Sequence, residues 1–231
     1  MENNVFDAVA PRYDFINDFF SLLLHRGWRR NLTDGADRDN GFIALDVCTG
    51  TADTAIALAH RYPRARVIGM DISQPMLERG RAKIHRENLA DRVELCLADG
   101  LSIPFADGRF DAVYNSFGLR NEVSFEPAVR EMVRALKPGG ILRILEFSIP
   151  ENRLLRRMYL SYLTRVMPAV SSLLGAPQDA YRYLARTVQE FPARGQVLDL
   201  MRKCGLFELR CESLTCGIVS CYHGRKPVPS A

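Results

Sequence analysis

The sequence predicts an α/β fold whose mostly parallel sheet is closed by a C-terminal antiparallel hairpin, and two patterns indicate it. From residue 42 to 147, short apolar runs alternate with amphipathic stretches, as in βα units around a parallel sheet. Near the C-terminus, two apolar runs are joined by a turn too short for a crossover, so these strands must be antiparallel. A chain of 231 residues, 47% of them hydrophobic and 25% charged, is expected to form one domain.

The predicted elements follow one another in regular order. The strands are expected at 42–47, 66–70, 92–97, 110–117 and 141–147, and the hairpin strands at 206–211 and 216–223. The helices between them are expected at 51–61, 74–87 and 124–136. Pro138-Gly139-Gly140 is predicted to stop the third helix and turn the chain before the fifth strand, because proline and glycine end helices.

Three successive strand ends carry an acid, and ligands of open α/β sheets bind at these ends. The first strand leads into the small-residue turn 46–53, which begins with Asp46 and lets a ligand approach the backbone. Asp71 follows the second strand, where a carboxylate would accept both ribose hydroxyls of a nucleoside. Asp99 follows the third, where it would accept the exocyclic amine of adenine. The sequence therefore predicts a nucleoside site here.

Two other interpretations of this edge are open. A dinucleotide would need the three glycines of GxGxxG, but the turn 48–53 keeps only one of them, so a pyrophosphate would be poorly cradled. An acid at a strand end can also simply cap the next helix, as Asp71 could before Ile72-Ser73. Three acids at three successive strand ends favour the nucleoside.

Charge and cysteine usage exclude several classes of protein. The net charge is +4, but Lys and Arg are spread along the chain without dense basic blocks, so no nucleic acid is expected. The six cysteines include no CxxC pair and are expected to be free thiols in a reducing cytosol. A metal site at Cys211, Cys216, Cys221 and His223 fails on spacing, since alternation along a strand would send Cys211 and Cys216 to opposite faces. No metal is therefore predicted.

Nothing in the sequence predicts secretion or a membrane span. Residues 1–10 lack the basic region of a signal peptide, and no apolar run reaches the ~18 residues of a spanning helix. We expect a soluble cytoplasmic protein, at most peripheral on the inner face of the membrane.

Motifs along nearly the whole chain carry a resemblance to one family. The motifs are Tyr13-Asp14-Phe15-Ile16-Asn17 with Ser21, His25 and Trp28; Ser116-Phe117-Gly118-Leu119-Arg120-Asn121; Leu136-Lys137-Pro138-Gly139-Gly140; Glu146-Phe147-Ser148; Tyr181-Arg182-Tyr183-Leu184; Phe191-Pro192; and Leu214-Thr215 with Gly217 and His223. With them, the chain resembles the UbiE/MenG/Coq5 family of quinone-biosynthesis C-methyltransferases. The predicted architecture is likewise that of the Rossmann-like class I S-adenosylmethionine-dependent methyltransferases.

The resemblance implies a cofactor, a substrate and a division of the chain. S-Adenosyl-L-methionine is expected as cofactor and a polyprenylated quinol as substrate, with demethylmenaquinol converted to menaquinol. Within a single domain, 1–231, it implies a helical substrate cap (1–40), a cofactor-binding core (42–147), a helical lid or tail-binding insertion (150–200) and the hairpin (206–223). The residues expected at the cofactor are Asp46, Gly50, Thr51, Asp71, Ile72, Asp99, Gly100 and Ser116.

One position departs from the family pattern. The family usually has Gly-Thr-Gly-Asp where this chain has Gly50-Thr51-Ala52-Asp53. If Ala52 has a positive φ, the substitution costs on the order of 1 kcal/mol and weakens cofactor binding; if φ is negative, it is harmless.

The chemistry of ring methylation suggests the catalytic residues. An aromatic carbon becomes nucleophilic when the neighbouring hydroxyl loses its proton, so a cation or base beside that hydroxyl is required. We expect Arg120, with Asn121, to stabilise the phenolate, His25 or a water to take the proton, and Tyr13 to orient the ring. Alternatively, Arg120 forms an ion pair with a carboxylate such as Glu146, and His25 has a packing or capping role.

Two apolar and basic segments are candidates for the isoprenoid tail or the bilayer surface. In 19–30, an apolar run is followed by His25 and arginines, and in 153–163 arginines are mixed with large apolar residues at helical spacing. The second could instead be an ordinary lid helix that packs its apolar face on the sheet.

Several functions remain open from sequence alone. The substrate could be the benzoquinol of the ubiquinone pathway or another lipophilic molecule, and a non-catalytic quinone-binding subunit is a further alternative. The intact motif from Ser116 to Asn121 favours the quinol methyltransferase. The oligomeric state, a homodimer included, is also open.

Overall fold

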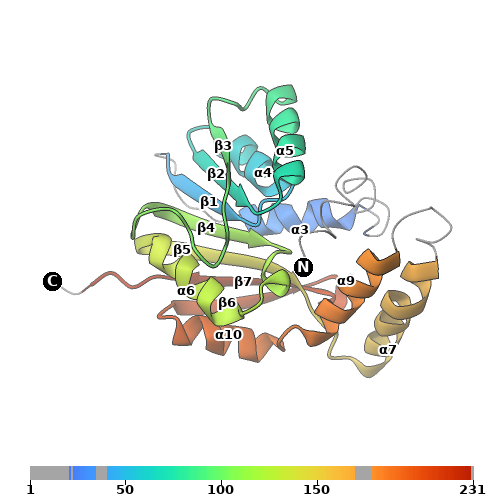
Figure 1. The fold of residues 1–231 in the computed structure, drawn as a ribbon. Coiled ribbons are helices and arrows are strands. Elements are labelled where there is room, and N and C mark those ends of the chain that lie inside the picture. The colour runs from blue at the N-terminus through green and yellow to red at the C-terminus, as the bar shows by residue number, and fades with distance from the viewer. Residues whose placement is uncertain (1–20, 22, 35–40, 170–177, 230–231) are drawn as a thin grey trace.

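The computed structural model describes residues 21, 23–34, 41–169 and 178–229 (Figure 1). The elements of these residues are, in chain order, α3 (Leu24–Thr33), β1 (Ile43–Val47), α4 (Asp53–Arg61), β2 (Arg66–Asp71), α5 (Gln74–Arg86), β3 (Val93–Leu97), β4 (Phe110–Ser116), η2 (Leu119–Asn121), α6 (Phe125–Ala135), β5 (Leu136–Phe147), α7 (Arg153–Ser161), η3 (Tyr162–Val166), α9 (Gln178–Glu190), α10 (Arg194–Lys203), β6 (Phe207–Leu214), η4 (Thr215–Gly217) and β7 (Val219–Arg225). In this part of the chain, no helix combines the length and the apolar character needed to cross a bilayer.

Seven strands form one sheet in the order β3-β2-β1-β4-β5-β7-β6. Strands β1 to β5 are parallel to one another, whereas β7 is antiparallel to both β5 and β6. The predicted fold class is therefore confirmed, hairpin included. The chain runs outward from β1 to β3 and then returns to place β4 on the other side of β1, so the strand order reverses between β1 and β4. In α/β sheets, ligands bind at such a reversal.

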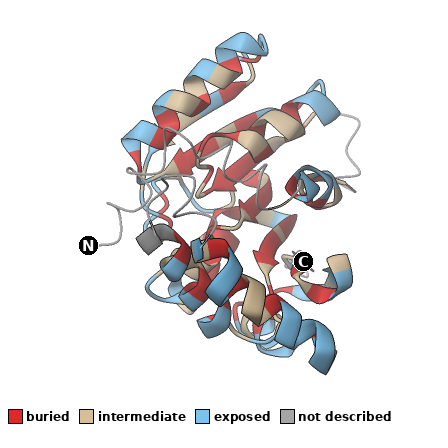
Figure 2. Ribbon diagram, turned by 90° about the vertical axis from the view of Figure 1, so that its right-hand side faces the viewer, coloured by how far each residue is buried: buried red, intermediate tan, exposed pale blue. Residues whose placement is uncertain are grey.

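Helices cover both faces of the sheet (Figures 1 and 2). On one face, α6 and α10 pack against strand residues such as Val113 and Leu142. On the other face, α3 and α4 pack through Trp28 and Leu58. The buried residues in Figure 2 follow the strands and the inner sides of these helices. Apolar side chains on both faces of the parallel strands explain why these strands are continuous apolar runs in the sequence.

The helical segment after β5 has a small core of its own. Tyr159 from α7, Leu163 from η3 and Val188 from α9 belong to one buried cluster, which packs against Phe147 at the end of β5. The next helix, α10, lies outside this cluster and packs into the main core through Val197. Within the segment 150–200, α10 thus belongs to the sheet layers, while α7, η3 and α9 form a separate unit.

The predicted start of the fifth strand was wrong by five residues. The strand begins at Leu136, directly after α6, and Leu136 pairs with Phe110 of β4. Pro138-Gly139-Gly140 lies inside the strand, where the register shifts, and Gly139 has a φ of +74°. Backbone hydrogen bonds with Lys226, at 2.8 and 2.9 Å, hold both glycines. The glycines therefore form a bulge that keeps the strand paired, whereas we expected a turn before it.

The hairpin differs from the prediction in one respect that concerns the cysteines. Cys216 lies in η4 with a φ of 55°, so it does not belong to a strand. The alternation argument used against a metal site is therefore wrong for this residue.

Candidate active site

The turn after β1 is built from backbone conformations that side chains rarely adopt. Cys48, Gly50 and Ala52 have φ values of 58°, 56° and 66°. Ala52 is the N-cap of α4, and its methyl group is fully buried in the core between β1 and α4. The position that departs from the family pattern therefore has a positive φ, so alanine costs on the order of 1 kcal/mol there.

Asp71 links the ends of the first two strands. Its carboxylate accepts hydrogen bonds from the backbone N–H of Gly50 (2.8 Å) and of Ser73 (3.0 Å). Ser73, and not Asp71, is the N-cap of α5, because the hydroxyl of Ser73 accepts from the N–H of Met76 at 3.4 Å. The capping alternative for Asp71 is therefore wrong. Asp99 accepts from the N–H of Leu101 at 2.8 Å and orders the loop after β3.

Asp46 is buried inside β1 with one oxygen unused. Its Oδ2 accepts from the hydroxyl of Thr49 at 2.6 Å, while Oδ1 has no hydrogen-bond partner in the described part of the chain. Burial raises the pKa of Asp46 to about 7, although Thr49 and Arg29 oppose this shift. Asp46 therefore titrates near neutral pH, unlike an exposed carboxylate.

A cluster of charges around Asp53 was missed by sequence reasoning. Arg29 of α3 lies 3.1 Å and Lys83 of α5 lies 2.7 Å from its carboxylate. Burial alone would raise the pKa of Asp53, but the two cations outweigh it and the pKa lies below its ordinary value. No local motif indicates this cluster, because its members are 24 to 54 residues apart in sequence.

His25 lies on the same side of the site as the charge cluster around Asp53. It is a buried residue of α3, and its Nδ1 lies 2.7 Å from the Ser21 hydroxyl. It also helps to lower the pKa of Asp53, so the two residues are neighbours. Tyr13 lies outside the described residues, so its predicted role in orienting the ring stays a prediction.

Glu122 is a second residue that the sequence did not indicate. It lies 3.4 Å from the Cys48 thiol, and a Cβ atom at position 100 would lie 2.6 Å from its Oε1. Only a glycine therefore fits at Gly100 with Glu122 in this position. Burial raises the pKa of Glu122, and the neighbouring Asp99 and Asp71 raise it further.

The remaining predicted cofactor residues lie along this edge. The Ser116 hydroxyl, at the end of β4, is buried and has no hydrogen-bond partner among the described residues. The Thr51 hydroxyl accepts from Lys83 Nζ at 2.8 Å. Ile72 is half exposed beside Asp71. A buried serine hydroxyl without a partner is costly unless a ligand satisfies it.

Arg120 forms the buried ion pair that was the alternative to a catalytic role. Its Nη1 lies 2.8 Å from Glu146, and the two side chains are 9% and 0% exposed. Nη1 also donates to the carbonyl of Phe117, while Nε is buried and has no hydrogen-bond partner among the described residues. The guanidinium is thus anchored through Nη1, and its Nε–H is available to a ligand.

Asn121 and aromatic rings complete this part of the site. The Asn121 amide donates to the Phe117 carbonyl (3.2 Å) and accepts from the Tyr183 hydroxyl of α9 (3.3 Å). Phe117 and Phe147 stack at a centroid distance of 4.6 Å, and Trp28 of α3 meets both of them edge-on. The rings and the arginine lie where β4 and β5 end, next to Ser116.

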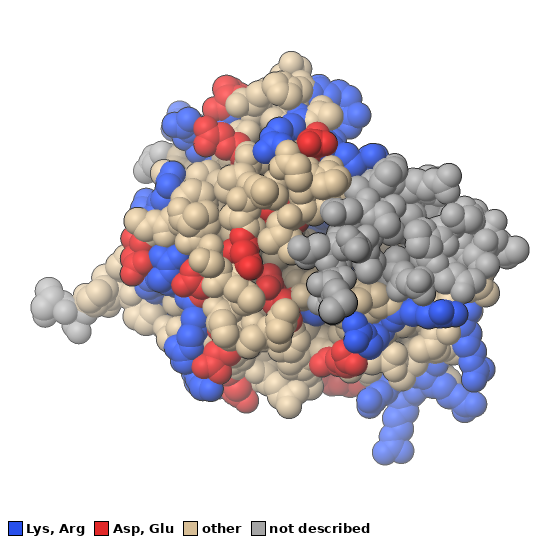
Figure 3. Space-filling model, in the orientation of Figure 1, with Lys and Arg blue, Asp and Glu red and all other residues tan. Residues whose placement is uncertain are grey.

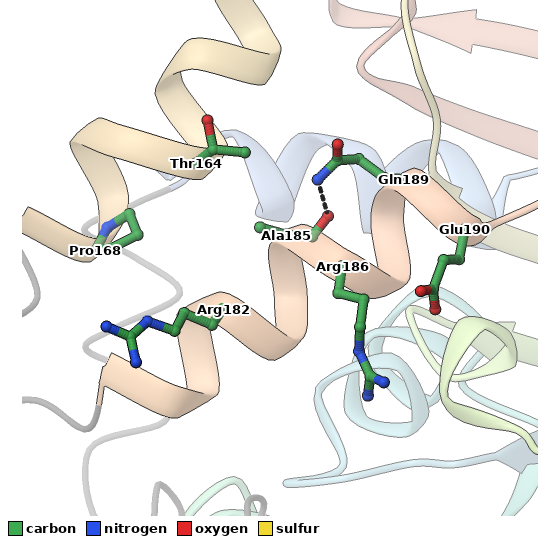
Figure 4. A pocket seen from close by; sticks show the side chains of 7 residues that line it. All are labelled: Thr164, Pro168, Arg182, Ala185, Arg186, Gln189 and Glu190. Atoms are coloured by element: carbon green, nitrogen blue, oxygen red, sulfur yellow. Dashed lines mark hydrogen bonds between the residues drawn. The ribbon is translucent and has the colours of Figure 1, made fainter.

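A pocket of about 410 Å³ lies between η3 and α9, away from these strand ends (Figure 4). The residues that line it are Thr164, Pro168, Arg182, Ala185, Arg186, Gln189 and Glu190. Its lining thus combines two arginines and a glutamate with apolar residues such as Pro168 and Ala185.

The residues at the strand ends fit an adenosyl cofactor without phosphates. Asp71 and Asp99 lie at neighbouring strand ends, and the buried Ser116 hydroxyl and Asp46 Oδ1 have no partners in the described chain. A phosphoethanolamine N-methyltransferase 2 of Haemonchus contortus, solved in complex with S-adenosyl-L-methionine, has the same fold, with a TM-score of 0.65 at 16% identity over 87% of this chain and 52% of that one. Fold and site thus define a class I S-adenosylmethionine-dependent methyltransferase.

Sequence comparison gives the family. Residues 2–226 match the ubiE/COQ5 methyltransferase family, and the chain belongs to it. It is 39% identical to the ubiquinone/menaquinone biosynthesis C-methyltransferase UbiE of Geobacter sulfurreducens, over 96% of this chain and 87% of that protein. It is also 39% identical to the demethylmenaquinone methyltransferase of Thermus thermophilus, over 96% of this chain and the full length of that one. The resemblance stated from the motifs is thereby confirmed.

Proposed function

We propose that this chain methylates a ring carbon of a polyprenylated quinol and converts demethylmenaquinol to menaquinol. The observation that carries the proposal is the buried arginine at the end of β4, Arg120, which is held by Glu146 next to the predicted cofactor residue Ser116. Family membership and the relative named demethylmenaquinone methyltransferase support the choice of quinol.

The cofactor residues divide into acids and backbone. Asp71 would bind the ribose hydroxyls and Asp99 the adenine amine, because each lies directly at or after a strand end. The turn 48–52 has no bulky side chain between the backbone and the ligand. When bound, S-adenosylmethionine supplies a methyl group on a sulfonium sulfur, and sulfur keeps the electron pair of the broken bond.

Arg120 provides the electrostatic part of the reaction. A quinol ring carbon attacks efficiently only after the adjacent hydroxyl has lost its proton, so the negative charge on that oxygen must be stabilised. The unpaired Nε–H of Arg120 can donate to this oxygen, while Nη1 is anchored by Glu146 and Phe117. Arginine does not deprotonate in proteins, so it stabilises the phenolate and does not act as the base.

The protons need a separate path. The quinol hydroxyl releases one proton before methyl transfer, and the methylated carbon releases its own proton afterwards, when the hydroxyl is restored. We assign the first proton to His25 or to a water beside it, because His25 is a buried imidazole on α3. Trp28, one turn later on the same helix, packs on Phe117 and connects α3 to the aromatic rings.

The direct test is anaerobic incubation with labelled S-adenosylmethionine and a reduced quinol with a short prenyl tail. Methylation of demethylmenaquinol alone, detected by mass analysis, is the expected result. Methylation of both the naphthoquinol and the benzoquinol would indicate a dual-purpose enzyme. If neither is methylated while calorimetry shows cofactor binding, the quinol assignment is wrong.

Arg120→Lys is the sharper variant for the role of Arg120, because lysine keeps a cation beside the buried Glu146. We expect kcat to fall by about 100-fold, since the guanidinium N–H that faces the phenolate is lost. Cofactor affinity should stay within a few fold. Turnover close to that of the wild type would remove Arg120 from the mechanism.

We also propose that α7 contacts an anionic bilayer surface, where the polyprenyl substrate is stored. The helix buries only Tyr159, whereas Leu154 and Met158 are 67% and 61% exposed. Arg153, Arg156 and Arg157 are interleaved with them. Figure 3 shows Lys and Arg gathered at the lower right, where Figure 1 has α7. Although Tyr159 packs on Phe147 at the end of β5, Leu154 and Met158 of the same helix are exposed, and arginines beside exposed apolar residues suit a membrane interface.

Vesicle co-sedimentation tests this contact. Wild type should bind vesicles that contain phosphatidylglycerol, and Leu154→Ser with Met158→Ser should reduce binding about tenfold, because buried apolar area drives insertion. Val228→Ser is the matched control: Val228 is 69% exposed but lies near the C-terminal end, on the opposite side of the molecule (Figure 1). No binding of wild type would end the membrane proposal.

A further inference from the structure

Besides the Ser116 hydroxyl, two buried polar groups near the ends of β4 and β5 have no hydrogen-bond partner in the described part of the chain. One is the Nε–H of Arg120. The other is the hydroxyl of Tyr159, which α7 contributes and which is only 7% exposed as a residue. Tyr159 lies in the segment 153–163 that the sequence indicates for the isoprenoid tail or the bilayer, but no catalytic role is predicted for it and the mechanism described above does not use it.

The two groups share one neighbourhood. The cluster that contains Tyr159 packs against Phe147, and the guanidinium carbon of Arg120 lies 5.2 Å from the centre of the Phe147 ring. Glu146, the ion-pair partner of Arg120, directly precedes Phe147. Burial raises the pKa of Tyr159, and Arg120 and Glu146 shift it in opposite directions, as charges do at close range.

Packing alone does not explain the hydroxyl. A buried hydroxyl without a partner is less favourable than a phenylalanine ring, which would fill the same space without losing hydrogen bonds to water. Arg120 Nε–H can only donate, whereas the Tyr159 hydroxyl can donate or accept, and neither has a hydrogen-bond partner among the described residues, so they do not bond to each other. Two unsatisfied donors close together are suited to an oxygen that carries negative charge.

We infer that Tyr159 binds the reactive oxygen of the quinol together with Arg120. The inference rests on the proposed function and names a second donor for the same phenolate. Because the Tyr159 hydroxyl stays protonated at neutral pH, it donates a hydrogen bond and takes no proton from the substrate. The same helix, α7, would then contribute both the hydrogen-bond donor to the quinol oxygen and the exposed leucines.

Tyr159→Phe tests the inference, because it removes the hydroxyl and keeps the ring. We expect kcat to fall about 10- to 100-fold, the usual loss for one hydrogen bond to a charged group. The acidic limb of the pH profile of kcat should move to higher pH by about one unit, because the bound quinol hydroxyl ionises less readily without the donor. Cofactor affinity should stay within twofold, and the Tm should be equal or higher.

Tyr222→Phe is the matched control. Tyr222 of β7 is fully buried, and its hydroxyl also has no hydrogen-bond partner among the described residues. Tyr222→Phe therefore also removes a buried tyrosine hydroxyl, but from the core of the sheet. Its Tm should be equal or higher, as for Tyr159→Phe, but its turnover and pH profile should match those of the wild type.

Two results would overturn the inference. Unchanged turnover and an unchanged pH profile in Tyr159→Phe would show that the hydroxyl does not contact the substrate. A clearly lowered Tm would show that it has a structural partner. Failure of the proposed function is distinguishable, since wild type would then methylate no quinol, and the Tyr159 variant would be compared on whichever phenolic acceptor wild type does methylate.

Discussion

The cofactor side and the acceptor side of this site are stabilised in different ways. On the cofactor side, Asp71 and Asp99 accept hydrogen bonds from backbone N–H groups of the turns at the ends of β1, β2 and β3. On the acceptor side, Arg120 depends on Glu146, which is 26 residues away, and Asn121 depends on Tyr183 of α9. The hydrogen bonds on the cofactor side thus come from the backbone of turns that follow strands, and those on the acceptor side come from side chains of separate elements.

Because of this difference, cofactor binding and turnover are expected to depend on different parts of the molecule. Backbone amides at the strand ends stay in place as long as the sheet is folded, so cofactor binding is expected to be insensitive to the helical segment after β5. The acceptor site needs that segment docked, because Tyr183 and Tyr159 come from it. Changes on the acceptor side should therefore reduce turnover without reducing cofactor affinity.

The largest effect is expected from Glu146→Gln. Removing one partner of a buried ion pair leaves the Arg120 charge uncompensated, which typically costs 3–5 kcal/mol, so we expect a loss of roughly 3 kcal/mol in the free energy of unfolding. Turnover should fall by more than 100-fold, because the guanidinium loses its anchor. Urea unfolding and single-turnover assays measure the two effects.

Glu126→Gln provides the control for the Glu146 variant. Glu126 pairs with Arg130 at 2.7 Å and with Lys203 at 2.6 Å, but these pairs lie at the surface, so their loss should leave the free energy of unfolding almost unchanged. Equal effects of the two variants would show that the buried pair has no special importance.

A pH-dependent stability is expected from Asp46 on the cofactor side. Its pKa is about 7 in the folded protein and near the ordinary 3.8 when unfolded, so the unfolded state ionises first as the pH rises. Its contribution to stability is therefore present below pH 4, lost progressively between pH 4 and 7, and constant above. Asp46→Asn removes this dependence and should gain stability relative to wild type across that window, by on the order of 2–4 kcal/mol in total. Urea unfolding at pH 5, 6, 7 and 8 measures it, and a constant difference between the two proteins would contradict it.

A smaller effect is expected from Asp71→Asn. The amide keeps one acceptor oxygen but loses the charge that we propose binds the ribose hydroxyls, and one hydrogen bond to a charged group is worth about 1.5–3 kcal/mol. Cofactor affinity should fall at least tenfold, while kcat at saturating cofactor stays within a few fold. Calorimetry and steady-state kinetics separate the two values. A fall in kcat with unchanged affinity would place Asp71 on the acceptor side.

Sequence reasoning was most successful where structure depends on neighbours along the chain. The strands and the antiparallel hairpin follow from apolar periodicity and turn residues, and the acids Asp71 and Asp99 follow from their places after strands. The errors concern contacts between residues far apart in the sequence. Gly139 lies in a bulge because the chain near Lys226 pairs with it, and no local pattern shows this pairing. Arg29, Glu122 and Tyr159 were not predicted individually for the same reason, since only the folded chain brings them next to Asp53, Cys48 and Phe147, respectively.

The smallest effect is expected at Ala52, where two terms nearly cancel. Glycine would relieve a strain on the order of 1 kcal/mol at the positive φ, but it would also remove a fully buried methyl group worth about 0.8 kcal/mol. Ala52→Gly should therefore change the free energy of unfolding by less than about 0.5 kcal/mol and cofactor affinity by less than threefold. Ala52→Val should lower both the free energy of unfolding and cofactor affinity. A β-branched residue is disfavoured at this φ, and there is little room around the Ala52 methyl, since a Cβ placed at Gly80 would already lie 3.2 Å from it. A clear gain in affinity for Ala52→Gly, measured by calorimetry, would show instead that the alanine weakens the cofactor side.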